Sequence, residues 1–209
     1  MVRRPQSNPR KEASQARSRL TVDTLLEATA RVLKKEGYDR ASTNKIAAAA
    51  GVSIGSLYQY FPSKEALVAA VIERHTQELS QVVHKALLKV AGRPFEIAVR
   101  ELVAAAIDAH RVDPKLHRVL AEEVPRTGRL ENIEAVERNA RKLFRDYLEA
   151  HRSKIAVADL DLAAFIFVTT VEALTHSAVL RNPDILADEK AKAFVDEVTR
   201  LVLRYLRTP

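Results

Sequence analysis

The chain of 209 residues contains no cysteine and no tryptophan. Without cysteine it has no disulfide scaffold, no thiolate zinc site and no cysteine nucleophile. No apolar run approaches the roughly 18 residues that a transmembrane helix needs. The N-terminus is basic but no apolar stretch follows it, so it does not resemble a secretory signal. We therefore expect a soluble, cytoplasmic protein with no membrane partner.

Charge of negative sign is scarce in the first third of the chain. The net charge is +7, and residues 1–62 hold eleven Lys or Arg against five Asp or Glu. Residues 63–209 hold 23 against 22, so almost all of the excess lies at one end. This asymmetry predicts that the N-terminal part binds a polyanion.

Glycine and proline are also few, with five and eight, and most of them mark boundaries between helical patterns. The segments between them are rich in Ala, Leu, Glu, Lys and Arg, which favour helix. No hairpin signal and no repeat occur, so we predict an all-α fold. The expected helices cover about 17–36, 43–50, 54–61, 63–90, 94–112, 114–124, 127–152, 157–181 and 186–207. The stretch 165–171 has strand-like propensity, but its apolar pattern extends far beyond strand length, which favours helix.

Two of the short helices are separated by a three-residue turn, Gly51-Val52-Ser53. Ser53 is the expected N-cap of the second helix, which must end before Pro62. Two short helices joined by a glycine-containing turn predict a helix-turn-helix at about residues 42–61.

Residues 43–67 read TNKIAAAAGVSIGSLYQYFPSKEAL, and this segment resembles the DNA-binding signature of the TetR family. The resemblance covers about residues 17–70. It implies an N-terminal three-helix DNA-binding domain, a C-terminal helical bundle for ligand binding and dimerisation, and a double-stranded DNA operator as partner. It also implies that Thr43, Tyr58, Tyr60 and Lys64 hold phosphates.

The chemistry of the second short helix fits base readout in a major groove. Gly55 and Ser56 are small enough for close approach of the backbone. Ile54 suits a thymine methyl group, and Gln59 can pair with adenine through two hydrogen bonds. The complete set of expected DNA-binding residues is Thr43, Asn44, Ser53, Ile54, Gly55, Ser56, Tyr58, Gln59, Tyr60 and Lys64.

Residues 51–55 also satisfy the G-x-S-x-G pattern of a hydrolase nucleophile elbow. That elbow requires a strand leading into it and a parallel sheet around it. Since an alanine-rich helix precedes Ser53, we interpret Ser53 as a helix cap and expect no enzyme activity.

The last two expected helices carry more apolar surface than one small domain needs. They predict either core alone or, as the resemblance implies, a homodimer in which two copies form a four-helix bundle. The expected interface residues are Ala164, Phe167, Val168, Val171, Thr175, Ala178, Phe194, Val198, Leu201, Val202 and Tyr205.

A helix at 94–112 that is apolar nearly all round predicts a central position and an adjacent cavity for a small molecule. The expected lining residues are Leu79, Leu102, Ala106, His110, Glu123, Phe144, Tyr147, Phe165, Thr169 and His176. The six histidines show no spacing typical of a metal site, so no metal or cofactor is expected. Glu172 and His176 are four residues apart and fit either a polar bridge or a ligand contact.

These features together predict a homodimeric transcriptional regulator that responds to a small molecule, most simply a repressor of a palindromic operator. The expected organisation is a disordered basic arm at 1–16, a DNA-binding domain at 17–63 and a ligand-binding and dimerisation domain at 64–209. The alternative is a dimeric DNA-binding protein that responds to no ligand.

Overall fold

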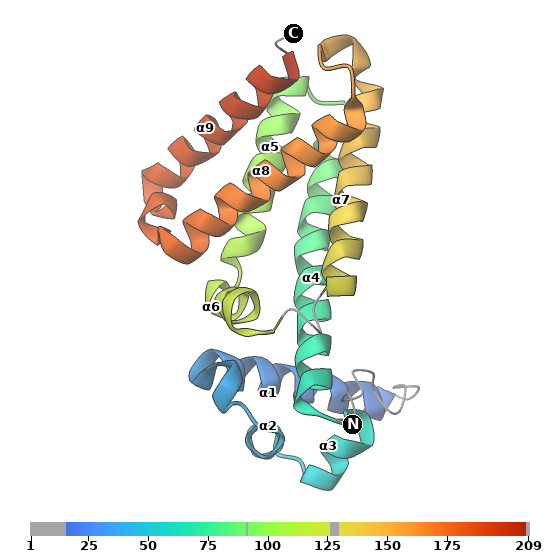
Figure 1. Ribbon diagram of the computed structural model, residues 1–209, viewed down its shortest axis with the longest axis vertical. Coiled ribbons are helices and arrows are strands. Elements are labelled where there is room, and N and C mark those ends of the chain that lie inside the picture. Colours follow the sequence, from blue (N-terminus) through green and yellow to red (C-terminus); the bar gives the residue numbers. More distant parts are fainter. Residues whose placement is uncertain (1–15, 91, 126–129, 208–209) are drawn as a thin grey trace. The chain divides into compact units, whose positions relative to one another are not determined.

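A computed structural model describes residues 16–90, 92–125 and 130–207 and contains helices, turns and loops, with no strand among those residues. The prediction of an all-α fold is confirmed. The helices are α1 (Ala16–Arg40), α2 (Thr43–Ala50), α3 (Ile54–Tyr60), α4 (Lys64–Val90), α5 (Phe95–Arg111), α6 (Pro114–Arg118), α7 (Leu130–Ala150), α8 (Leu160–Arg181) and α9 (Asp188–Arg207) (Figure 1). A π-helical turn, Val119–Glu123, continues α6, and short 3₁₀ turns precede α8 and α9.

Local signals set most of these boundaries as predicted. Gly37 interrupts α1 with φ 77° and ψ 173°, a conformation that side-chain-bearing residues rarely adopt. The Ser63 hydroxyl accepts a hydrogen bond from the Ala66 amide at 3.2 Å and caps the start of α4. The strand-like stretch 165–171 lies inside α8. The expected basic arm at 1–16 lies almost wholly outside the described residues.

The chain divides into two compact units whose boundary differs from the expected one after residue 63. Unit 1 runs to His75 and also contains Lys115–Ile133, whereas unit 2 contains Thr76–Pro114 and Glu134–Pro209. Helix α4 therefore contributes its first turns to unit 1. Residues 115–125, which we expected in the ligand-binding domain, belong to unit 1 because their apolar side chains are buried there.

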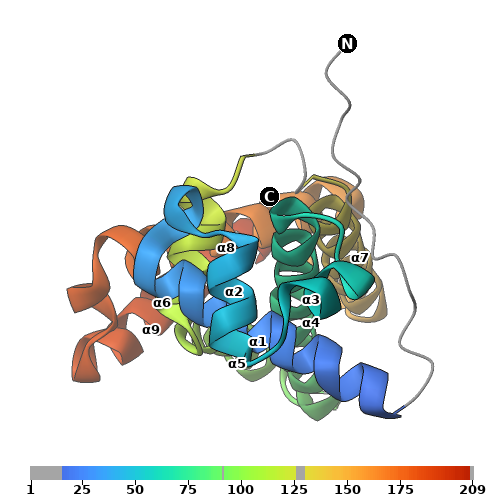
Figure 2. The ribbon, with the colours of Figure 1, turned by 90° about the horizontal axis from the view of Figure 1, so that it is seen from below.

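Unit 1 has its own hydrophobic core. Helices α2 and α3 lie on the same side of α1 (Figure 2). Leu25, Leu33, Ile46 and Leu57 are completely buried in the core that these helices share. From the distant segment, Leu116, Val119 and Leu120 join this core. Burial of a large apolar side chain contributes about 1.5–3 kcal/mol. The segment is therefore part of the structure that holds the helix-turn-helix.

The centre of unit 2 is α5, which packs against both α8 and α9 (Figure 1). Phe95, Ala98, Val99 and Val103 are fully buried on one face of α5. The other face of α5 is more exposed to solvent than the sequence predicted, since Ile97 is 44% exposed and Asp108 is exposed.

Among the described residues, α8 is the one helix that is long and apolar enough to cross a bilayer by length and composition. Eight of its residues, including Ala163, Ala164 and Phe167, are instead buried in the core of unit 2. A buried helix of a helical bundle has the same composition, so this feature is weak evidence for a membrane span.

Candidate nucleic-acid interface

Two serine caps define the helix-turn-helix. The Ser42 hydroxyl accepts a hydrogen bond from the Lys45 amide at the start of α2, and the Ser53 hydroxyl accepts one from the Ser56 amide at 3.1 Å at the start of α3. Between them, Gly51 adopts φ 69° and ψ 26°, the left-handed conformation that ends a helix. Ser53 is thus a cap preceded by a helix, as interpreted above, and no strand leads into it.

The outer face of α3 carries the residues expected to read bases. Leu57 is completely buried, so the opposite side of α3 faces outward. On that side, Ile54 is 38% and Tyr58 40% exposed, and Gly55 and Gln59 are also exposed. A short helix with a small residue in its first turn and an exposed glutamine fits a major groove. Contact of these residues with DNA stays a prediction.

A hydroxyl pair joins the two helices on this exposed side. The Thr43 Oγ1 and Tyr58 Oη atoms lie 3.1 Å apart, within hydrogen-bonding distance. Both residues were expected to hold phosphates, and the structure brings them together. The Ser56 hydroxyl lies 2.9 Å from the Ser53 hydroxyl, so part of its hydrogen-bonding capacity is used within the protein. Asn44 is exposed at the start of α2.

The remaining two expected phosphate ligands are attached to α1. The Lys64 ammonium donates a hydrogen bond to the Tyr38 carbonyl at 3.1 Å and lies 4.0 Å from the centre of the Tyr38 ring. The Tyr60 hydroxyl donates to the Ser18 hydroxyl at 3.5 Å. Sequence reasoning identified neither the Ser18 contact nor the Tyr38 contact. No local pattern reveals either contact, because each links residues far apart in the chain.

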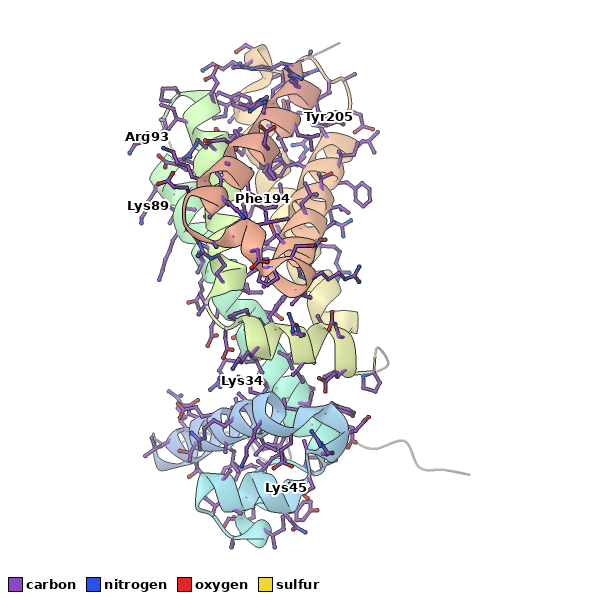
Figure 3. The ribbon with its side chains drawn as sticks, turned by 90° about the vertical axis from the view of Figure 1, so that its left-hand side faces the viewer. Lys34, Lys45, Lys89, Arg93, Phe194 and Tyr205 are labelled. Atoms are coloured by element: carbon purple, nitrogen blue, oxygen red, sulfur yellow. The ribbon has the colours of Figure 1, made fainter. Side chains whose placement is uncertain are left out.

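Some of the basic side chains of unit 1 form hydrogen bonds and ion pairs within the unit. The Arg31 guanidinium donates to the Ala49 carbonyl at 2.9 Å and ties α1 to the end of α2. The Lys45 ammonium, labelled in Figure 3, is paired with Glu36 and also donates to the Arg40 carbonyl at 3.0 Å. The hydrogen bond from Lys45 holds the pKa of Glu36 below its usual value. Lys34, also labelled in Figure 3, is an exposed residue of α1.

The expected ligand-pocket residues occupy three different environments. Leu102 and Phe144 are buried in unit 2, where the Phe144 ring stacks on Phe167 with centroids 3.6 Å apart. Phe165 and Thr169 are exposed on the outer side of α8, opposite Phe167, so their expected place in a cavity is corrected. Glu123 belongs to unit 1, where it meets Tyr38, and is likewise removed from the pocket. The half-buried pocket residues on unit 2 are Leu79, Ala106, His110, Tyr147 and His176.

Two groups of rings stand out in unit 2. The centroid of the Tyr147 ring lies 4.4 Å from that of His151 and 6.1 Å from that of Phe95. Burial raises the pKa of the Tyr147 phenol to about 12. The His110 and His176 rings meet edge to face with centroids 5.1 Å apart. His110 also bonds the Ala106 carbonyl at 2.7 Å, and burial lowers its pKa despite that bond.

The expected dimer-interface face of α8 is turned inward. Seven of the eleven residues are buried within the protomer and form its own core: Ala164, Phe167, Val171, Thr175, Ala178, Val198 and Val202. Val168, Phe194 and Tyr205 are half-buried, the last two on α9 (Figure 3), and Leu201 is 53% exposed. The large apolar residues that α8 does expose are Leu162, Phe165 and Leu174.

Two family models and several known proteins match this chain. Residues 25–71 match the model of bacterial regulatory proteins of the tetR family, and residues 94–206 match the model of the tetracyclin repressor-like C-terminal domain. The HTH-type transcriptional repressor NicS of Pseudomonas putida is 30% identical over 200 residues, covering 90% of this chain and 92% of NicS. The nucleoid occlusion factor SlmA of Haemophilus ducreyi is 35% identical over 97 residues, which span 46% of this chain and 47% of SlmA.

Solved structures share the fold. A TetR-family regulator from Mesorhizobium loti superposes with a TM-score of 0.73 at 20% identity, covering 90% of this chain and 98% of that one. The fatty acid degradation regulator FadR from Bacillus halodurans gives a TM-score of 0.69 at 21% identity, covering 90% and 96%. The fold and helix-turn-helix define a DNA-binding regulator. The chain belongs to the TetR family of bacterial regulatory proteins.

Proposed function

We propose that this protein is a cytoplasmic transcriptional repressor, without enzyme activity, that binds a palindromic operator as a homodimer and releases it when a small molecule occupies unit 2. The observation that carries the DNA-binding part is the outer face of α3, where Ile54, Gly55, Tyr58 and Gln59 stand clear of the core. The name of NicS, a repressor aligned over nearly the whole chain, supports the sign of regulation.

Dimerisation is supported by apolar side chains that one protomer leaves uncovered. Leu162 is 51% and Phe165 44% exposed on α8, and Leu201 is 53% exposed on α9. Large apolar side chains exposed on two helices are typical of an interface between subunits. We place the interface on these outward residues together with the half-buried Phe194 and Tyr205, rather than on the buried face expected from sequence.

A small-molecule site in unit 2 is supported by two hydroxyl groups. Among the described residues, the side-chain oxygens of Tyr147 and Thr175 are buried without a hydrogen-bond partner. Such a group costs about 1–3 kcal/mol unless something satisfies it, which makes each one a candidate contact for a ligand. Leu79, Leu102, Ala106, Phe144 and the His110–His176 pair complete the proposed lining.

The test is a titration of DNA binding. Purified protein should shift a duplex taken from the intergenic DNA beside its gene, and rising salt should weaken the complex. A metabolite panel is then added to the complex. Release by one compound supports the proposal, whereas binding that no compound changes favours the ligand-independent alternative. To move the population from about 99:1 to 1:99, an effector must prefer the released state by about 5.5 kcal/mol.

A further inference from the structure

A segment from the middle of the chain is built into the DNA-binding unit. Leu116, Val119 and Leu120 are buried in the same core as the helix-turn-helix. Beside them, His117 Nδ1 lies 3.0 Å from His75 Nε2, and both side chains are buried. The turn Val119–Glu123 is π-helical, a form that often occurs at functional positions. The end of this turn is therefore fixed relative to α1.

At that end, Glu123 meets the break in α1. Its Oε2 atom accepts a hydrogen bond from the Tyr38 amide at 2.8 Å. A Cβ atom on Gly37 would lie only 2.6 Å from the same oxygen. Gly37 thus serves two purposes: it adopts the positive φ that ends the helix, and it leaves room for the carboxylate.

Tyr38 is bonded on its other side to Lys64. Its amide is held by Glu123, while its carbonyl accepts from the Lys64 ammonium at 3.1 Å and its ring lies beneath that ammonium at 4.0 Å. An ammonium group has three donors, so one bond to a carbonyl leaves two for another acceptor. Glu123, Tyr38 and Lys64 form a continuous chain of contacts from the π-helical turn to the start of α4.

We propose that Glu123 is a positioning residue for DNA binding, because it fixes the Tyr38 backbone that orients the ammonium group of Lys64. The inference rests on the proposed function, in which Lys64 holds a phosphate. A lysine already held in place loses less side-chain freedom when it binds than a free one does. Loss of the Glu123 carboxylate releases Tyr38 and leaves Lys64 less well oriented.

A simple argument from net charge predicts the opposite effect on DNA binding when the Glu123 carboxylate is removed. Removal of a carboxylate from a DNA-binding unit raises its positive charge and by itself strengthens binding to a polyanion. Glu123→Ala should nevertheless weaken binding by about three- to tenfold, the value of one hydrogen bond. The matched control is Glu122→Ala, which makes the same change of charge at the adjacent exposed residue and should bind at least as well as the wild type.

The experiment measures fluorescence anisotropy of full-length variants on a labelled duplex selected by the wild type from a random pool. Glu123→Ala is also made in a Lys64→Ala background, where its effect should disappear. Glu123→Gln keeps an acceptor for the Tyr38 amide and should bind like Glu122→Gln. Glu123→Asp is a smaller change that withdraws the carboxylate by one methylene group. It should also weaken binding, and it provides the test if Glu123→Ala does not fold. Thermal melting checks the fold of each variant.

Equal or tighter binding by Glu123→Ala or Glu123→Asp overturns the proposal. So does a loss of the same size in the Lys64→Ala background, because the effect then does not pass through Lys64. A wild type that selects no duplex contradicts the proposed function itself, so the two failures are distinguishable.

Discussion

The hydroxyl groups of Thr43 and Tyr58 lie 3.1 Å apart and connect α2 to α3 on the exposed side of the helix-turn-helix. The pair has spare hydrogen-bonding capacity, since each hydroxyl can donate one bond and accept two. A phosphate that reaches both groups would bind two helices at once. Such a contact would fix the register of α3 on DNA and leave base readout to its neighbours on the outer face.

Tyr58→Phe removes the hydroxyl and leaves the ring. It should weaken binding to all duplexes alike by about three- to tenfold, because a contact to a phosphate carries no sequence information. Anisotropy titrations on selected and random duplexes measure this. Tyr147→Phe in unit 2, which removes a phenol hydroxyl away from the helix-turn-helix and the proposed dimer interface, is the control and should bind normally in the absence of a ligand. Unchanged affinity for Tyr58→Phe would rule out a phosphate contact through this hydroxyl.

Gln59→Ala should relax the choice of base at a single position of the half-site, at a cost of roughly 1–3 kcal/mol. Binding-site selection with wild type and variant measures the change position by position. Gln81→Ala, at an exposed position of α4 outside unit 1, is the control. Identical preferences for wild type and Gln59→Ala would show that Gln59 does not read a base.

Phe165→Arg and Leu201→Arg should each convert the dimer to a monomer, because a buried unpaired charge at a subunit interface is costly. Analytical ultracentrifugation measures the change in mass. Leu88→Arg is the control, since Leu88 is 66% exposed on α4 and should tolerate a charge. Val202→Arg, by contrast, should unfold unit 2, because Val202 is only 3% exposed. A stable dimer for both outward variants would place the interface elsewhere.

Gly37→Ala should destabilise unit 1 more than Gly51→Ala does. Gly37 has φ 77° and ψ 173°, a region where a side chain costs about 1–3 kcal/mol, and its new Cβ would displace the Glu123 carboxylate. Gly51 has left-handed helical angles and no atom within 4 Å of a new Cβ, so it incurs backbone strain alone. Chemical denaturation measures both. Equal losses would argue against the Glu123 contact.

The stability of unit 2 should fall as the solution becomes acidic. Burial lowers the pKa of His110 below its ordinary value of 6.5, so the folded protein favours the neutral ring. The unfolded chain takes up the proton first, and the stabilisation present above pH 6.5 is lost as pH falls through the lower folded pKa. Melting curves between about pH 8 and pH 5 should show this slope and a flatter one for His110→Gln. His84→Gln, at an exposed position of α4, is the matched control.

Local signals explain why so much of the fold was predictable. Gly37, Gly51, Ser53 and Ser63 act on the turns next to them, so their effect can be read from sequence without knowing the rest of the fold. The exposed face of α3 follows from the same reasoning, because burial of Leu57 places Ile54 and Gln59 outside.

Long-range packing explains the errors. Helix α8 is apolar all round, so its sequence does not indicate that Phe167 turns inward and Phe165 outward. Helix α4 is continuous from Lys64 to Val90, and its periodicity gives no sign that it passes from one unit to the other. Glu123 reaches Tyr38 across 85 positions of sequence, a contact that no local pattern encodes.

Selection of binding sites from a random duplex pool, followed by sedimentation of the selected complex, tests the central claim most directly. The account predicts one enriched sequence made of two inverted half-sites about one helical turn, 10 base pairs, apart, bound by two protomers. Gln59→Ala should lose preference at symmetry-related positions of both halves. A pool that shows no enrichment, or an enriched site without symmetry bound by one protomer, would contradict the account.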